Sequence, residues 1–145
     1  MDFFDALHTS ASGLTAQRLR MNLISGNLAN INTTRTKQGG PYRRKEPVFA
    51  AQSQNTSFRK ILTSQNFENL PQVKIVRIFE DRSPPLMKYD PTHPDADEDG
   101  YVAMPNINLM EEMVNLISAT RSYEANVAAV KAAKEMALKA LEIGR

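Results

Sequence analysis

The chain of 145 residues contains no cysteine and no tryptophan, and it has two histidines, His8 and His93. The absence of cysteine excludes disulfide bonds and thiolate metal sites, and it is compatible with an oxidising compartment without requiring one. Because the two histidines lie far apart in the sequence, a histidine-based metal centre is not expected. Composition therefore predicts no metal site.

Long apolar runs are also missing. No run reaches the roughly 18 residues that a membrane-spanning helix needs. The N-terminal sequence MDFFDALHTS has an acidic residue where a secretory signal peptide carries its basic region, so classical secretion is not expected. The net charge of +2 and the isoelectric point near 9.0 are mildly basic, well short of a chain whose main partner is nucleic acid.

Motifs that would carry catalysis are absent as well. The sequence has no G-x-S-x-G pattern, and Gly39-Gly40-Pro41 is not followed by the lysine of a phosphate-binding loop. His8 and His93 are better explained as structural or exposed residues than as catalytic ones. The sequence therefore predicts no catalytic residue, no cofactor and no enzyme.

What is present is a long amphipathic stretch at each end of the chain. Residues 106–143 contain neither glycine nor proline, and Asn108 with Glu111 forms a capping box that predicts a helix start. Apolar positions recur every three and four residues, a period of roughly 3.5 that is typical of helices packed on other helices. The row comprises Met113, Leu116, Thr120, Tyr123, Val127, Val130, Lys134, Ala137 and Leu141.

Residues 3–31 repeat this spacing in a second predicted helix, which Asp2 can cap. Its row contains a strict heptad of Leu7, Leu14, Met21 and Leu28. Polar members such as Gln17 and Lys134 interrupt the two rows, so a tight two-helix coiled coil is unfavourable and packing among several copies is expected. The core of an ordinary helical hairpin remains the alternative.

Between the helices the sequence predicts a small β-rich part. Residues 73–79 alternate in a strand-like way, residues 57–63 form a second β-like run, and residues 47–51 can begin a strand. Beyond residue 80, five prolines favour an extended connector into the last helix. These prolines are Pro84, Pro85, Pro91, Pro94 and Pro105.

We therefore expect a mainly α fold with a small β-rich middle, in which the long terminal helices pair as a coiled-coil-like axial part. Residues 1–31 with 107–145 would form this axial domain. Residues 32–106 would form the loop, the β-rich outer region and the proline-rich connector.

A basic cluster follows the first helix and contains Arg35, Lys37, Arg43, Arg44 and Lys45 beside Tyr42. A solvated loop is the simplest interpretation. Because one aromatic side chain accompanies the charges and no matching fold motif is present, an acidic protein surface is a better partner than nucleic acid. A nucleic-acid- or acidic-surface-binding helical module that uses Arg35–Lys45 is the alternative function, and salt-dependent retention on heparin would detect it.

An acidic turn precedes the last helix. Asp95, Asp97, Asp99 and Gly100 match the opening of a calcium loop, D-x-D-x-D-G, but the position of its bidentate glutamate is occupied by Asn106. A solvated acidic loop is therefore expected. We hypothesise that this turn meets Arg43, Arg44 and Lys45 of a neighbouring subunit, where charge pairs would fix orientation more than affinity.

The same segments resemble one known family. ASGLTAQRLRMNLISGNLANINTTRT, followed by GGPYRRKEPVF, resembles the N-terminal signature of bacterial flagellar rod and hook proteins. HPDADEDGYVAMPNIN and EEMVNLISATRSYEANVAAVKAAKEMALKALEIG are similar to proximal rod members of that family. The resemblance covers both ends and the connector, whereas residues of about 50–80 add little to it.

The resemblance implies a structural protein of the flagellar basal body, whose terminal helices pack with those of neighbouring subunits around a hollow tube that transmits motor torque to the hook. The motif NLANINTT would place Asn27, Asn30 and Asn32 at the exit of the first helix. The subunit-packing positions would be Leu7, Leu14, Met21, Leu28, Leu116, Tyr123, Val127 and Val130.

Partners and location are implied in the same way. The chain would assemble with copies of itself and with the rod proteins FlgB, FlgF, FlgG and FliE, in a rod that crosses the periplasm. The flagellar type III export apparatus would secrete it without a cleaved signal, with its terminal segments unfolded until assembly.

Overall fold

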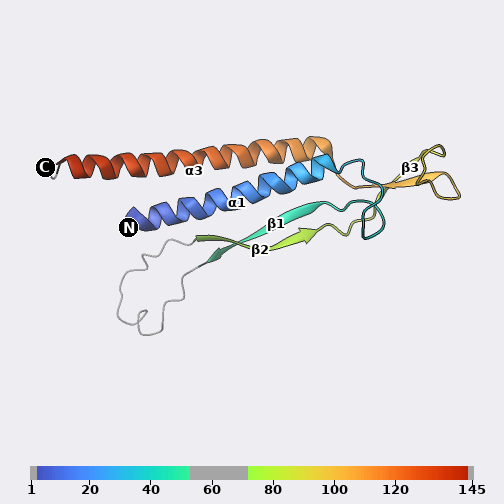
Figure 1. The fold of residues 1–145 in the computed structure, drawn as a ribbon, viewed down its shortest axis with the longest axis horizontal. Coiled ribbons are helices and arrows are strands. Elements are labelled where there is room, and N and C mark those ends of the chain that lie inside the picture. Colours follow the sequence, from blue (N-terminus) through green and yellow to red (C-terminus); the bar gives the residue numbers. More distant parts are fainter. Residues whose placement is uncertain (1–2, 53–71, 144–145) are drawn as a thin grey trace, which may run out of the picture.

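A computed structural model describes residues 3–52 and 72–143 (Figure 1). The architecture is two long helices with two short antiparallel hairpins between them in sequence, so the predicted mainly α fold with a small β middle is confirmed. The elements are α1 (Phe3–Ala29), β1 (Lys45–Gln52), β2 (Gln72–Glu80), β3 (Leu86–Tyr89), β4 (Tyr101–Met104) and α3 (Leu109–Ile143).

The two helices lie side by side and run in opposite directions (Figure 1). The predicted cap of α3 is confirmed, because Asn108 Oδ1 accepts hydrogen bonds from the backbone N–H groups of Met110 (3.0 Å) and Glu111 (3.4 Å). With 27 and 35 residues, α1 and α3 are roughly 40 Å and 52 Å long. The C-terminal end of α3 therefore extends past the start of α1 (Figure 1).

Small side chains form the contact between the helices. Ala16 on α1 and Ala119 and Ala133 on α3 are buried, and a Cβ placed on Gly13 would lie 3.1 Å from Asn126 Nδ2. The predicted apolar row of α3 is thus displaced by one residue, since Glu112, Ala119 and Ala133 are buried in place of their larger neighbours. Four members of that row are exposed, namely Met113, Thr120, Lys134 and Leu141. Because the two helix axes lie close together, only small side chains fit between them, whereas the prediction from sequence had placed the large apolar side chains there.

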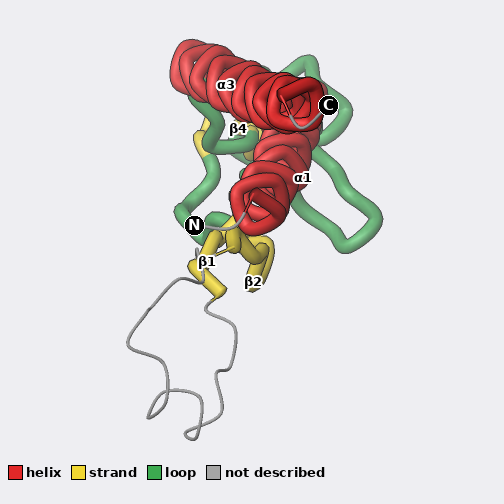
Figure 2. Tube along the Cα trace, turned by 90° about the vertical axis from the view of Figure 1, so that its left-hand side faces the viewer, coloured by secondary structure: helices red, strands yellow, loops and turns green. Residues whose placement is uncertain are grey.

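The β1–β2 hairpin packs against α1. Its register runs from Lys45 opposite Glu80 to Gln52 opposite Gln72, with an irregularity between Val48 and Phe49. Figure 2 shows α3, α1 and this hairpin as successive layers, with α1 in the middle. The strands expected at 47–51 and 73–79 are confirmed, whereas the run at 57–63 lies outside the described residues.

The β3–β4 hairpin corrects one expectation, because residues 86–104 were predicted as an extended connector. Leu86 pairs with Met104 and Tyr89 with Tyr101, whose rings meet edge to face with centroids 5.3 Å apart. The turn is closed by Asp90 N–H donating to Gly100 O (2.9 Å), and Gly100 has a φ of 78°. The hairpin projects beyond the end of the helix pair and contacts no other described helix or strand (Figure 1).

Neither helix, within residues 3–143 as far as they are described, has a segment long and apolar enough to cross a membrane.

Candidate functional site: a buried polar junction

Asn27, near the end of α1, is 1% exposed and is surrounded by polar groups. Its Nδ2 donates to Lys45 O (3.0 Å) and to Glu112 Oε2 (2.9 Å), while its Oδ1 accepts from Lys45 N–H (2.9 Å) and from Tyr42 Oη (3.1 Å). The amide thus uses two donors and two acceptors, which is its full capacity. It satisfies both peptide groups of Lys45 as a neighbouring strand would.

Glu112, in the first turn of α3, is also 1% exposed. Its Oε2 accepts from Asn27, and its Oε1 accepts from Arg44 Nε at 2.7 Å. The carboxylate therefore meets a guanidinium and an amide at the positive end of the helix dipole. Breaking such a buried pair by removing one partner costs about 3–5 kcal/mol, because the other charge is left uncompensated.

Arg44 extends this contact to the surface. Its Nη2 lies 3.5 Å from Glu111 Oε1 and its Nη1 lies 3.4 Å from Glu46 Oε2. Burial lowers the pKa of Arg44, but the hydrogen bond and the charge of Glu112 outweigh burial, so the pKa is raised above its ordinary value. The guanidinium is therefore a permanent cation that faces Glu112.

Tyr42 and Lys45 complete the group, which we call the polar junction (Asn27, Tyr42, Arg44, Lys45 and Glu112). The pKa of Tyr42 is raised by burial, Lys45 opposes the shift, and Glu80 and Glu112 add to it. The Lys45 Nζ lies 3.3 Å from Glu80 Oε1 and 5.9 Å from the centroid of the Tyr42 ring. The Tyr42 hydroxyl thus remains a neutral donor to Asn27.

The polar junction connects three segments that are distant in sequence: the end of α1, the residues that lead into β1, and the start of α3. Every donor and acceptor of the Asn27 amide is used in a hydrogen bond within the chain, so this side chain has no hydrogen-bonding capacity left for a ligand. Among the described residues, no group of three or more histidines and carboxylates could hold a metal ion. The polar junction therefore fixes α1 and α3 relative to each other.

The predicted exit motif divides into three roles. Asn27 belongs to the polar junction. Asn30 caps the end of α1, because its Nδ2 donates to Gly26 O (2.8 Å) and its Oδ1 accepts from Thr33 Oγ1 (3.2 Å). Asn32 is exposed, and its side chain makes no hydrogen bond within the described part of the chain.

The predicted packing positions lie beside the line of contact between the helices. All of these side chains are half-buried in the single chain. Thr120 Oγ1, which lies 3.6 Å from Met21 Sδ, shows that these flanks touch across the helix pair. Their packing against other subunits stays a prediction.

The charged residues that were predicted to act together have different surroundings in the structure. Arg44 and Lys45 pair with carboxylates of their own chain, whereas Arg43 is exposed. In the acidic turn, Asp95 Oδ2 accepts from Thr34 Oγ1 (2.7 Å). Asp97 Oδ1 accepts from the backbone N–H groups of Asp99 (3.2 Å) and Tyr101 (2.7 Å). Two of the three aspartates therefore shape the chain's own loops, and pairing of the acidic turn with a neighbouring subunit stays a prediction.

Glu112 was missed as a site residue. In the sequence it is one of two glutamates in the first turn, and both fit the charge preference of a helix start. Glu111 is exposed whereas Glu112 is buried, a difference set by the one-residue displacement of the helix contact. Its place directly before Met113 in the apolar row was the available signal.

Paired terminal helices, held by a fully bonded polar junction and carrying large exposed apolar side chains, define a structural subunit. Residues 7–37 match the family described as Flagella basal body rod protein. Residues 98–143 match the family described as Flagellar basal body rod FlgEFG protein C-terminal.

Individual relatives agree over the whole length. The chain is 51% identical to the flagellar basal-body rod protein FlgC of Bacillus subtilis over 154 residues, with 100% of both chains covered. It is 44% identical to FlgC of Borreliella burgdorferi, covering 99% of this chain and 98% of the relative. It is 36% identical to FlgC of Salmonella typhimurium, with both chains fully covered. The chain belongs to the FlgC family of flagellar basal-body rod proteins.

Proposed function

We propose that this chain is a structural subunit of the flagellar basal-body rod, and that it assembles through its terminal helices into a tube that carries motor torque to the hook. Family membership supports the rod assignment and gives no support to the nucleic-acid-binding alternative. The relatives compared above bear the name of a flagellar basal-body rod protein.

One observation carries the assembly step. Although α1 and α3 pair, α3 keeps many large apolar side chains exposed, with exposed fractions from 47% to 86%. They are Leu109, Met110, Met113, Val114, Ile117, Met136, Leu138, Leu141 and Ile143. Burial of such side chains is worth about 25 cal/mol per Å², so repeated contacts between copies would stabilise the assembly considerably.

The polar junction suits a mechanical role. It fixes the end of α1 to the start of α3 and to the segment leading into β1, so the three layers would move together under load. In this proposal residues 1–31 and 107–145 form the axial domain and residues 32–106 form the outer region. The other rod proteins FlgB, FlgF, FlgG and FliE are the proposed neighbours, and the type III apparatus is the proposed export route.

Glutamate at exposed apolar positions of α3 tests this function. Ile117→Glu and Leu141→Glu should each change the free energy of unfolding of the isolated chain by less than about 0.5 kcal/mol, because neither side chain is buried in it. Both should abolish swimming when they replace the natural copy in a motile relative, and basal bodies isolated from those cells should lack rods.

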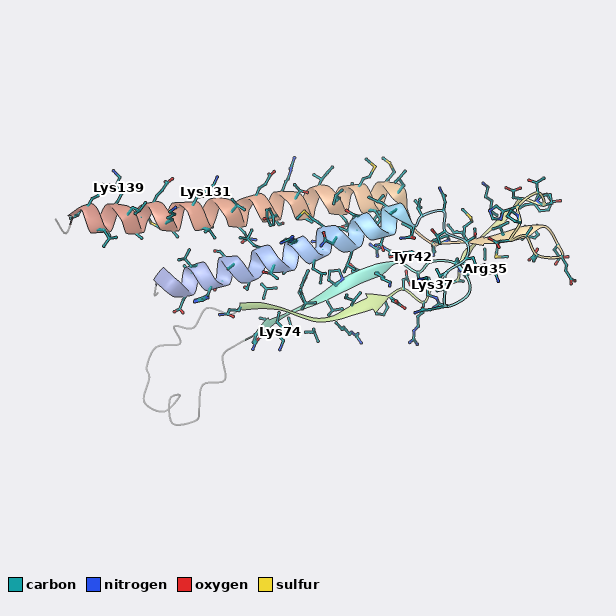
Figure 3. All side chains as sticks on the ribbon, in the orientation of Figure 1. Arg35, Lys37, Tyr42, Lys74, Lys131 and Lys139 are labelled. Atoms are coloured by element: carbon teal, nitrogen blue, oxygen red, sulfur yellow. The ribbon has the colours of Figure 1, made fainter. Side chains whose placement is uncertain are left out.

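Arg35→Glu is the control, since Arg35 is exposed in the loop after α1, outside the helical surface proposed for assembly (Figure 3). It should preserve swimming. Normal rods in both the Ile117→Glu and the Leu141→Glu strains would contradict assembly through this helix.

A further inference from the structure

An open groove of about 770 Å³ lies between α1 and the C-terminal end of β2. Leu23, Ile78 and Phe79 give it apolar walls, and Ile78 and Phe79 are 47% and 43% exposed. Arg43, Arg77 and Arg82 line the same groove, together with Lys45 and Glu80, whose opposite charges pair with each other. Among the ion pairs of the described residues none includes these arginines. The groove thus combines apolar surface with positive charge.

The β3–β4 hairpin has the opposite charge. Leu86, Met87 and Tyr89 are more than half exposed, and Tyr101 is 43% exposed. Its turn carries the carboxylates of residues 95–99, of which Glu98 and Asp99 have exposed side chains that make no hydrogen bond to the described residues. The hairpin therefore presents an apolar stem with an acidic tip.

The hairpin of one chain does not fill the groove of the same chain. β2 ends on the side of the molecule from which β3–β4 projects, but the hairpin points away from the helix pair and contacts none of α1, β1 and β2 (Figure 1). Each copy consequently has one unfilled groove and one hairpin that buries Val102 but leaves its other large apolar side chains exposed, with apolar surfaces of similar kind and charges of opposite sign.

We propose that the acidic tip of the β3–β4 hairpin docks in the arginine-lined groove of a second copy of this chain. The proposal rests on the proposed rod function and adds to it a particular contact outside the helices. Because the two surfaces differ, the contact is heterologous and leaves a hairpin free at one end and a groove free at the other, as an open-ended assembly requires.

Disulfide cross-linking tests this contact directly, because the natural chain has no cysteine. Chains with Glu98→Cys and chains with Arg82→Cys would be produced together in cells that lack the natural copy, and their isolated basal bodies oxidised. We expect a cross-linked dimer from the mixture and none from either variant alone. Lys131→Cys in place of Arg82→Cys is the control and should give no dimer with Glu98→Cys.

A dimer from Glu98→Cys alone would overturn the proposal, since it requires tip-to-tip contact. Oxidised basal bodies that contain both variants but no dimer between Glu98→Cys and Arg82→Cys chains would also overturn the proposal, while leaving the rod function intact. If the chain with no substitution is missing from basal bodies, the rod function itself fails, and the docking proposal fails with it.

Charge reversal gives a second readout in the same cells. Glu98→Lys with Asp99→Lys, or Arg77→Glu with Arg82→Glu, should each lower the number of assembled rods about tenfold. Both pairs combined in one chain should restore them. Arg35→Glu with Lys74→Glu, which makes an equal charge change at exposed residues outside the groove, should have no effect (Figure 3). Failure of the combined variant to recover would overturn the pairing.

Discussion

Asn27 bonds to three other segments through one amide group. Its orientation is fixed by the backbone of Lys45, which offers one donor and one acceptor, so only one placement of the amide oxygen and nitrogen satisfies both. The remaining nitrogen donor then points at Glu112 and the remaining oxygen lone pair at Tyr42. An asparagine with this set of contacts cannot be replaced by an acid of the same shape.

Asn27→Asp should therefore lower the free energy of unfolding by about 3 kcal/mol or more. The substitution removes the donor to Lys45 O and places a second carboxylate against Glu112. Urea unfolding followed by circular dichroism measures the loss. Asn22→Asp, at an exposed position of the same helix, should change the value by less than about 0.5 kcal/mol. Equal losses for the two variants would refute the role of the polar junction.

Gly26 is a position where a substitution should stabilise the fold. It lies inside α1, and the nearest described atom to an added Cβ is Tyr42 Oη at 3.9 Å, an ordinary contact distance. Gly26→Ala should raise the free energy of unfolding by about 0.5–1 kcal/mol, because alanine loses less backbone entropy in a helix. Gly40→Ala, at a φ of 73°, should lower it by about 1 kcal/mol. A destabilising Gly26→Ala would show that the site is tighter than these distances indicate.

At the scale of elements, α3 divides into two parts. As far as Ala133 it contacts α1, and Ala133 is its last buried residue in the described range. Beyond that, Met136, Leu138, Leu141 and Ile143 are at least half exposed, and the helix end extends past α1 (Figure 1). Helical segments without packing partners open readily, so the two parts should differ in local stability.

Amide hydrogen exchange should show this difference. In a dilute sample of the full chain, residues 112–130 should be protected, while residues 136–143 should exchange close to the rate of an unstructured peptide. In assembled material the second range should gain protection. Uniform protection along α3 in the dilute sample would contradict the division.

Elements with strong local signals were predictable from the sequence. Asn108 marks the start of α3 because its side chain caps the helix, and residues 73–79 alternate as a strand does. The β3–β4 hairpin was not predictable, because its strands have four residues each and prolines lie in and around it. Its turn depends on Asp97 and Gly100, and hydrogen bonds of this kind leave no periodic pattern.

The polar junction was hidden for a different reason. Arg44 and Glu112 are 68 positions apart, and the sequence placed Arg44 in a basic loop and Glu112 at a helix start. Each of these local interpretations is physically reasonable. The contact depends on how α1, α3 and the segment before β1 come together, which local propensity does not determine.

The molecule as a whole has little interior. Besides Pro105, the buried apolar side chains of the described residues are Ala16, Ile24, Val102, Ile107, Ala119 and Ala133, and half of these six are alanines. A core this small supplies little of the hydrophobic stabilisation that folding needs. The isolated chain should therefore be only marginally stable, and contacts between copies should add to its stability.

The thermal midpoint of unfolding should accordingly rise with protein concentration, because association stabilises the folded chain by mass action. Differential scanning calorimetry over a hundredfold concentration range measures the effect. Leu141→Glu should abolish this dependence and leave the midpoint at low concentration unchanged. A midpoint of the natural chain that is independent of concentration would argue against self-association.

The contact between Asn27 and Glu112 also bears on how quickly the fold forms. It joins residues separated by 85 positions, so closing that loop costs about 4 kcal/mol of chain entropy before the contact contributes anything. Single helices form within about a microsecond, whereas contacts of high sequence separation form much later. The pairing of the two ends is thus a late folding event, and a chain threaded lengthwise through a narrow conduit would remain linear until both ends have emerged.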